Sequence, residues 1–171
     1  MKKILIVSDT HRQNELLYRL LELLKPIDMF IHCGDIEGDN EAMIKRAGCP
    51  VHMVAGNNDY GNMYPALDVF EIEGHRVLLT HGHRYSIYRT LDPLYYLAME
   101  NQAEIVMFGH LHVPILEKRD GITILNPGSL TYPRQANRLP SYIMMTVSDD
   151  GNVQYDIRYL EKPVRGGFGF Y

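Results

Sequence analysis

Five short clusters of Asp, Asn, His and Gly recur along the chain. They are Asp9-Thr10-His11, Gly34-Asp35, Gly56-Asn57-Asn58-Asp59, His81-Gly82-His83 and Gly109-His110-Leu111-His112. Imidazole, carboxylate and amide groups are ligands of Mn, Fe, Zn and Ni ions in proteins. Glycines beside such residues let the backbone turn sharply and come close to an ion. The residue types and their spacing therefore favour a site for divalent metal ions.

Each cluster follows a short apolar run that predicts a buried strand. The predicted strands are 3–7, 29–33, 51–55, 76–80 and 105–108. In open α/β sheets, binding sites collect at the carboxyl ends of the strands. We therefore expect the clusters to converge in space, although they are far apart in the sequence.

Two helices are predicted between the first three strands. Leucines recur at helical spacing from Leu16 to Leu24, and Pro26 ends the pattern. A shorter helix over 41–46 stops at Gly48. The order strand, helix, strand, helix, strand is typical of a parallel sheet with helices on its faces.

The second half of the chain is dominated by hairpin signals. Gly-containing turns occur at Glu73-Gly74-His75, Asp120-Gly121 and Asp149-Asp150-Gly151-Asn152. The strands beside these turns, apart from 76–80, are predicted over 69–72, 115–118, 122–125, 141–147 and 153–159. One more helix is predicted over 91–101. We therefore expect mainly antiparallel strands in this half.

Length and composition bound the class of protein. The chain has 171 residues, of which 46% are hydrophobic and 22% charged, as in a soluble globule and unlike a disordered chain. We expect one domain over 1–161 and a Gly/aromatic tail over 162–171. No apolar run approaches the ~20 residues of a membrane span, and the first residues lack the apolar stretch of a signal peptide. A cytoplasmic location with no membrane partner is the expectation.

The cysteines and the net charge exclude further classes. Cys33 and Cys49 form neither a disulfide framework nor a CxxC motif. A net charge of −4 argues against nucleic acid as a partner, because such binders need a basic surface. The negative net charge does not exclude a small anionic substrate, since bound metal ions can make the local electrostatic field positive.

In their order, the clusters resemble the motifs of the calcineurin-like metallophosphoesterases, which run D-x-H, G-D, G-N-x-D, H-G-H and G-H-x-H. The chain is most similar to the small bacterial and archaeal phosphodiesterase subfamily. That subfamily also has an Asn-Pro-Gly-Ser turn, which Asn126-Pro127-Gly128-Ser129 matches. The resemblance covers about residues 3–160. It implies an α/β fold, a four-layer αββα sandwich of two mixed β-sheets flanked by helices.

The resemblance implies two metal positions and assigns their ligands. The first position would be formed by Asp9, His11, Asp35 and His112, and the second position by Asp35, Asn57, His81 and His110. Asp35 would bridge the two ions. Mn²⁺ is the expected ion, and Ni²⁺, Fe²⁺, Co²⁺ and Zn²⁺ suit the same ligands. Two ions ~3.5–4 Å apart can clamp a phosphoryl group during in-line displacement.

Asn58 departs from the family pattern. The family often has His, and this subfamily often Cys, at this position of the G-N-x-D motif, and in members with His that residue contacts the phosphate and can help the leaving group depart. An amide can contact a phosphate, but it cannot transfer a proton. We therefore expect a preference for acidic leaving groups, or a substrate that protonates its own leaving group.

Other residues in or near the motifs have more than one interpretation. Asp59 is expected to orient His11 or another ligand. His83 is either a phosphate contact or proton donor, or a structural residue. Arg12 is either a bidentate phosphate clamp or a solvated surface residue. A substrate rim could also include Arg84, Arg89, Arg134 and Arg138.

Several aromatic residues outside the motifs are expected to be structural. His32, His52 and His75 are predicted to be surface or core histidines. The tyrosines near one predicted helix are predicted to be core residues or subunit contacts; they are Tyr85, Tyr88, Tyr95 and Tyr96. The Asn126–Ser129 turn is predicted to brace the loop that carries His110 and His112.

Together these patterns predict a metal-dependent phosphodiesterase that hydrolyses a small phosphodiester by attack of a hydroxide bridging two ions. The alternative is a catalytically weak metal-binding scaffold or protein-interaction module on the same fold, as in the retromer subunit Vps29. All seven ligand positions hold competent residues, which favours the enzyme, whereas Asn58 favours the scaffold. The resemblance also implies a homodimer or a homotetramer.

Overall fold

The computed structural model describes residues 1–60 and 64–161. Within these residues the chain forms helices and strands in the order β1 (Lys2–Val7), α1 (Glu15–Leu24), β2 (Met29–His32), α2 (Asn40–Ala47), β3 (Val51–Met53), β4 (Leu67–Ile72), β5 (His75–Thr80), α3 (Asp92–Glu100), β6 (Ile105–Met107), β7 (Pro114–Arg119), β8 (Ile122–Pro127), β9 (Ser141–Val147) and β10 (Val153–Tyr159). The predicted tail over 162–171 lies outside the described residues.

The first sheet has the strand order β10-β9-β1-β2-β3. β1, β2 and β3 run parallel, with Ile4 opposite Met29 and Phe30 opposite Val51. The hairpin of β9 and β10 joins β1 in antiparallel orientation. The predicted parallel strands, connected by α1 and α2, are therefore confirmed.

The second sheet has the strand order β4-β5-β6-β8-β7. The predicted hairpins β4–β5 and β7–β8 are confirmed, but β5, β6 and β8 run parallel at the centre of the sheet. The expectation of mainly antiparallel strands is wrong there. β8 is almost entirely buried and lies beside β6, whereas the charged, exposed β7 turns back to the sheet edge.

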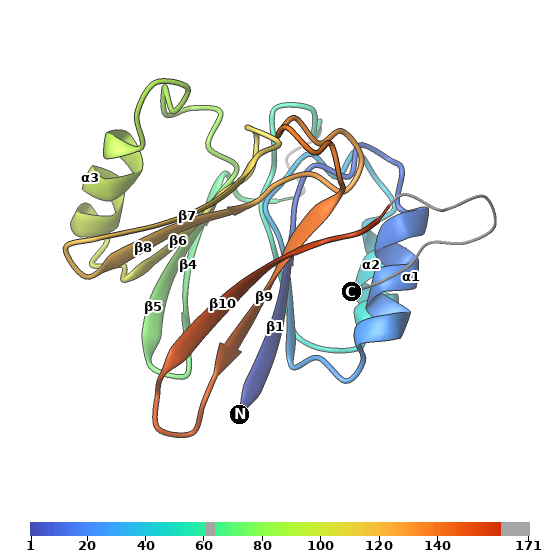
Figure 1. Cartoon of the computed structure of the whole chain (residues 1–171), viewed down its shortest axis with the longest axis horizontal. Coiled ribbons are helices and arrows are strands. Elements are labelled where there is room, and N and C mark those ends of the chain that lie inside the picture. The colour runs from blue at the N-terminus through green and yellow to red at the C-terminus, as the bar shows by residue number, and fades with distance from the viewer. Residues whose placement is uncertain (61–63, 162–171) are drawn as a thin grey trace.

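The two sheets face each other, with α1 and α2 outside one sheet and α3 outside the other (Figure 1). Three apolar clusters fill the spaces between these four layers. Leu5 and Val7 pack toward the leucines of α1, whereas Ile4 and Ile6 pack toward the second sheet. The third cluster joins α3 to the outer face of the second sheet. The predicted four-layer αββα sandwich is therefore confirmed.

α1 shows how the sequence builds one of these layers. Leu17, Leu20 and Leu21 are fully buried, and each contributes about 1.5–3 kcal/mol when removed from water. The helix ends at Leu24, just before Pro26, as the sequence predicts.

Two further expectations concern cysteines and membranes. Cys33 is buried and Cys49 is partly buried, and both thiols are free. None of the helices in the described ranges has the length and apolarity needed to cross a membrane.

Candidate metal centre

The clusters meet where β1, β2, β3, β5 and β6 end, and backbone hydrogen bonds join their loops. The amide of Asp9 donates to Gly34 O, and the amide of His11 donates to Asp35 O, both at 3.0 Å. The amide of His110 donates to Asp9 Oδ2 at 3.0 Å, linking positions 101 residues apart. Segments that are distant in the sequence therefore share one site, as the strand order predicts.

Most of the predicted ligands have a left-handed backbone. Positive φ angles between 46° and 67° occur at Asp9, His11, Asp35, His110 and His112. Asp and His adopt this conformation more readily than most residues, but it still costs of order 1 kcal/mol or more. Such strain persists only where the surrounding structure enforces it, and it is concentrated at functional sites.

Three of the predicted histidine ligands have their Nδ1 atoms tied to acceptors. Nδ1 of His81 donates to Cys33 O at 2.7 Å, and Nδ1 of His112 donates to Tyr132 O at 2.8 Å. Nδ1 of His11 donates to Glu37 Oε1 at 2.6 Å. Carbonyl and carboxylate oxygens only accept, so the proton of each neutral ring lies on Nδ1. In that neutral form, each Nε2 presents a lone pair, as a metal ligand must.

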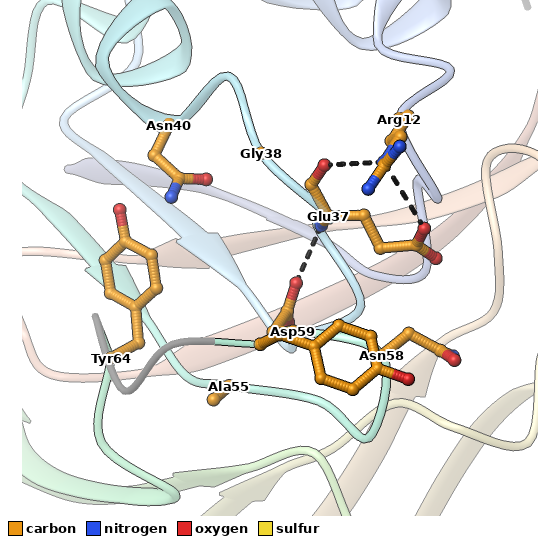
Figure 2. A pocket seen from close by; sticks show the side chains of 9 residues that line it. Arg12, Glu37, Gly38, Asn40, Ala55, Asn58, Asp59 and Tyr64 are labelled. Carbon is orange, nitrogen blue, oxygen red and sulfur yellow. Dashed lines mark hydrogen bonds and ion pairs between the residues drawn. The ribbon is translucent and has the colours of Figure 1, made fainter.

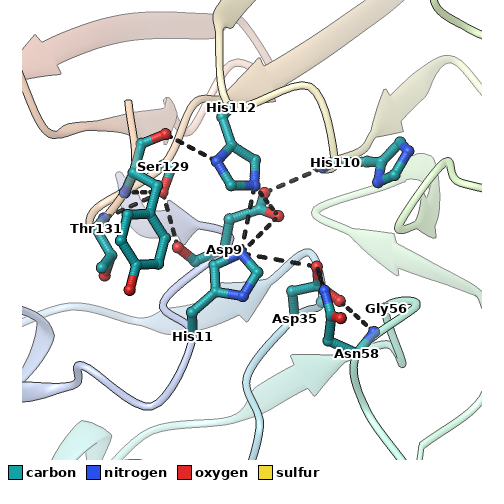
Figure 3. Close-up of polar contacts among 12 residues, drawn as sticks. Asp9, His11, Asp35, Gly56, Asn58, His110, His112, Ser129 and Thr131 are labelled. Carbon is teal, nitrogen blue, oxygen red and sulfur yellow. Dashed lines mark hydrogen bonds and ion pairs between the residues drawn. The ribbon is translucent and has the colours of Figure 1, made fainter. Parts of the chain in front are cut away.

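At the first position, these lone pairs face one another. His11 Nε2 lies 3.3 Å from His112 Nε2, and His112 Nε2 lies 3.0 Å from Asp9 Oδ1 (Figure 3). Two imidazole lone pairs and a carboxylate repel at such distances unless a cation lies between them. The ligand atoms of Asp9, His11 and His112 all lie within 4.8 Å of one another. The donor set therefore fits a metal ion.

Two buried polar ligand atoms, one from each position, lack hydrogen-bond partners among the described residues. They are Nε2 of His81 and Oδ1 of Asp9. Nε2 of His81 lies 3.5 Å from Asp35 Oδ2 and 3.9 Å from Asp9 Oδ1. An unpaired buried polar atom costs about 1–3 kcal/mol and is rare in proteins. A divalent ion would satisfy both atoms.

Asp35 lies between the two positions. Its Oδ2 is 3.7 Å from His11 Nε2 and 3.5 Å from His81 Nε2. Asn58 donates to both carboxylate oxygens, through its amide N–H at 2.9 Å and its side-chain Nδ2 at 2.7 Å. A Cβ at Gly56 would collide with Asp35 Oδ1, which explains the glycine. The carboxylate is thus central and tightly held.

The remaining predicted ligands lie at the open side of the centre. Asn57 is exposed and, with His110, lines the pocket of about 210 Å³ that contains His11, Asp35 and His112. The His110 ring lies 5.2 Å from the His81 ring. His83 is half-buried beside both rings, and its buried Nδ1 lacks a partner within the described chain. The pocket is therefore the place where a substrate can reach the centre.

The electrostatic environment keeps the carboxylates charged. Burial acts to raise the pKa of Asp9, but the His112 and His81 rings outweigh it and lower the pKa. Burial opposes the same shift at Asp35, where His81 and Asn58 lower the pKa well below its usual range. Burial and the neighbouring His81 lower the pKa of His110 to about 4. Ionised carboxylates and a neutral imidazole are the forms that bind metal.

Asp59 contacts backbone amides and not a histidine. Its Oδ1 accepts from the amides of Ile36 and Glu37, and its Oδ2 accepts from the amide of Gly56. Glu37 holds His11 instead. Asp59 therefore fixes the loops on both sides of Asp35, and its predicted contact with His11 is not present.

Arg12 is 75% exposed and lines a neighbouring pocket of about 250 Å³ (Figure 2). Its Nε donates to Glu37 O at 3.1 Å and lies 3.6 Å from Glu37 Oε2. Asn58 lines both this pocket and the one beside the ligands. Arg12 therefore lies next to the centre and is paired with Glu37.

The sequence predicts no ligand contact for three residues at the centre. Glu37 and Tyr132 hold His11 and His112, and the hydroxyl of Tyr88 lies 2.6 Å from Nε2 of His110. Arg134 lines the ligand pocket, whereas Arg12 does not. The only sequence signal for Glu37 is its position two residues after Asp35, and the carbonyl of Tyr132 gives none.

The Asn126–Ser129 turn braces the centre, as predicted. Asn126 Nδ2 donates to Gly109 O at 2.6 Å, and the Ser129 hydroxyl donates to Asp9 O at 2.8 Å. The same hydroxyl accepts from the amides of Thr131 and Tyr132. Both sides of the centre are therefore held by this turn.

The histidines outside the motifs are structural, as predicted. His32 is buried between Thr10 Oγ1 and the amide of Gly34, and burial lowers its pKa to about 4. His52 stacks on Phe70 with ring centroids 3.5 Å apart. The tyrosine prediction holds for Tyr95 and Tyr85, which pack in the third apolar cluster. Tyr88 instead contacts the centre, and Tyr96 is exposed.

Comparisons with known proteins identify the family. The model of the calcineurin-like phosphoesterase superfamily domain matches residues 1–150. A "Probable metallophosphoesterase" of Mycoplasma pneumoniae is 34% identical over 151 residues, covering 86% of this chain and 91% of that protein.

Two solved structures show the same fold. A "predicted phosphoesterase" from Streptococcus pneumoniae has a TM-score of 0.81 and 29% identity, covering 92% of this chain and 89% of the other. Vacuolar Protein Sorting 29 from Cryptosporidium parvum has a TM-score of 0.80 at 20% identity, covering 99% and 95%, which is a likeness of fold alone. On the family match and the identity of its relatives, the chain belongs to the calcineurin-like phosphoesterase superfamily.

Proposed function

We propose that this chain is a metal-dependent phosphodiesterase that hydrolyses a small phosphodiester at a centre of two divalent ions. The observation that carries the proposal is the pair of facing Nε2 atoms of His11 and His112, 3.3 Å apart, beside the buried Asp9 carboxylate. The second position, with the unpartnered Nε2 of His81, supports a second ion. Mn²⁺ is the proposed ion.

When bound, the two ions supply a water-derived nucleophile at neutral pH and polarise the phosphoryl group. The chain contributes the geometry. Asp35, held through both carboxylate oxygens by Asn58, is the proposed bridging ligand. The pocket of about 210 Å³ suits a small substrate, and Arg134 at its rim is the proposed cation for the phosphate. Arg12 is a second, outer candidate, since Glu37 already partners it.

Leaving-group chemistry follows from Asn58 and His83. Asn58 donates its amide hydrogens to Asp35 and has no proton to transfer, so the enzyme should favour acidic leaving groups. His83, with an unpartnered Nδ1 beside His81 and His110, is the proposed phosphate contact or proton donor. A rate that hardly varies with leaving-group pKa would contradict the preference for acidic groups.

The test is hydrolysis of bis-p-nitrophenyl phosphate by chelator-stripped protein, with and without added Mn²⁺. Asp35→Asn should abolish metal-restored activity. Asp120→Asn is the matched control, because Asp120 is an exposed aspartate with a similar φ of 50° against 55° for Asp35. Activity that needs Mn²⁺ and is lost only in Asp35→Asn supports the phosphodiesterase.

The second candidate is the catalytically weak scaffold, which Asn58 favours because it replaces the His or Cys expected at its position. No hydrolysis with Mn²⁺, Ni²⁺, Co²⁺ or Zn²⁺ would support this candidate over the enzyme. The homodimer or homotetramer and the cytoplasmic location stay predictions.

A further inference from the structure

Of the four histidines among the proposed ligands, His110 alone is held by a side-chain hydroxyl. The Tyr88 hydroxyl lies 2.6 Å from His110 Nε2, and the two rings are 5.3 Å apart at 63°. Tyr88 comes from the segment between β5 and α3 and is 70% exposed. The side chain therefore contacts the centre from the solvent side.

The His110 ring needs such a partner because its backbone alone does not fix it. The amide of His110 is tied to Asp9 Oδ2, but the χ2 torsion of a histidine is soft and roughly two-fold. Rotation about χ2 exchanges the sides on which the ring nitrogens lie. With Nε2 engaged by Tyr88, Nδ1 is the nitrogen left for an ion. His11, His81 and His112 show the reverse arrangement, since their Nδ1 atoms are engaged.

We propose that Tyr88 is a positioning residue for the second position. Its hydroxyl oxygen accepts a hydrogen bond from Nε2–H of His110, which fixes both the ring orientation and the nitrogen that carries the proton. Nδ1 is then the nitrogen whose lone pair is left for an ion beside His81, whose ring lies 5.2 Å away. This inference rests on the proposed function, because it assigns Tyr88 a role at one of its two metal positions.

The proposal predicts a selective effect of removing one hydroxyl. Partners that orient metal-ligating histidines typically change metal affinity or activity by about 10–100-fold. Tyr88→Phe should therefore weaken binding of the second ion by about that factor. Binding of the first ion should stay within about twofold, because His11 and His112 have their own partners.

The experiment compares wild type, Tyr88→Phe and the control Tyr96→Phe, which changes an exposed tyrosine on α3. Calorimetric titration of chelator-stripped protein with Mn²⁺ gives the affinity at each position. Long-range ¹H–¹⁵N spectra of the metal-free protein show which nitrogen of His110 carries the proton. Thermal unfolding of each variant confirms that it is folded.

The expected result is an Nε2–H proton on His110 in wild type and selective loss of second-ion affinity in Tyr88→Phe alone. An Nδ1–H proton in wild type overturns the inference, because Tyr88 would then be the donor and Nδ1 would have no lone pair to offer. Two unchanged affinities in Tyr88→Phe also overturn it and leave the proposed function standing. A wild-type chain that binds no divalent ion overturns both.

Discussion

The two proposed metal positions differ in how firmly their ligands are held. At the first position, His11 and His112 donate to a carboxylate and to a main-chain carbonyl, and Asp9 is fully buried. At the second position, His81 is equally buried, but Asn57 is exposed and His110 is held by an exposed tyrosine.

One centre therefore combines a first position whose ligands are preorganised with a second position that is accessible from solvent. The hydrogen-bond partners of His11 and His112 fix the first position before an ion binds, which lowers the cost of ordering its ligands on binding. The open second position gives a substrate access to the ions. We therefore expect the first ion to bind more tightly than the second.

The largest expected effect comes from Asp9→Asn, which should weaken the binding of both ions and so remove the difference in affinity between the two positions. Asp9 belongs to both groups of side chains that lie close enough to hold an ion, one with His11 and His112 and the other with Asp35 and His81. Neutralising it should lower affinity at both by more than the ~100-fold that loss of an outer partner causes. Metal content after dialysis against Mn²⁺, measured by elemental analysis, checks this. Asp120→Asn is again the control, and wild-type metal content in Asp9→Asn would contradict the prediction.

A smaller and selective effect is expected from Glu37→Gln. The amide oxygen still accepts from His11 Nδ1, but the negative charge that strengthens this contact is lost. First-ion affinity should fall by about tenfold, the low end for such partners, with the second ion unaffected. Titration with Mn²⁺ measures both affinities, and Glu41→Gln is a control on the exposed side of α2. A loss of affinity confined to the second ion would contradict the assignment of Glu37 to the first position.

A stability effect is expected from Asn126→Ala, which acts on the loop of the second position. Its side chain donates to Gly109 O in a buried site, and an unsatisfied buried acceptor costs about 1–3 kcal/mol. Urea unfolding of the metal-free protein should show this loss in free energy. Gln154→Ala, an exposed change on β10, should lie within about 0.5 kcal/mol of wild type. Equal stability of the two variants would show that the brace is dispensable.

The smallest expected effect lies far from both positions, at His75. Hydrogen bonds to Glu104 and to Gly151 O raise the pKa of His75 above its ordinary 6.5. The stabilisation is therefore complete below pH 6.5 and is lost as the pH rises through the folded-state pKa. Because Glu104 is exposed, it amounts to less than about 1 kcal/mol.

The difference in unfolding free energy between wild type and His75→Gln should thus be larger at pH 6 than at pH 8.5. Denaturant unfolding at both pH values measures it. A difference that grows with pH would have the wrong sign. Because the His75–Glu104 pair lies outside the metal centre, its pH dependence reports on the stability of the fold separately from metal binding.

Much of the fold follows from local patterns. The apolar runs, the helix ended by Pro26 and the three hairpins all occur where the sequence predicts them. The parallel centre of the second sheet does not follow, because a hairpin signal does not say which of its strands lies inside. The exposed charges of β7 and the buried residues of β8 carry that information.

At the centre, motif spacing predicts the residues whose chemistry is specific to metals. It does not predict Glu37 or Tyr88, because their contacts join residues 26 and 22 positions apart. Carboxylates and hydroxyls of this kind are common on surfaces, so only the folded chain separates them from ordinary surface residues. The same holds for Asp59. The motif places it at the centre, but the sequence does not predict that its carboxylate accepts hydrogen bonds from backbone amides.

The left-handed backbone at Asp9, His11, Asp35, His110 and His112 has a practical consequence. The apolar layers and the loop hydrogen bonds hold these residues in place through contacts within the chain. The chain should therefore stay folded when chelators remove the metal ions from the centre. One preparation can then be loaded with different ions in turn. The supply of ions, and not the folding of the chain, would then decide how much of the protein is active.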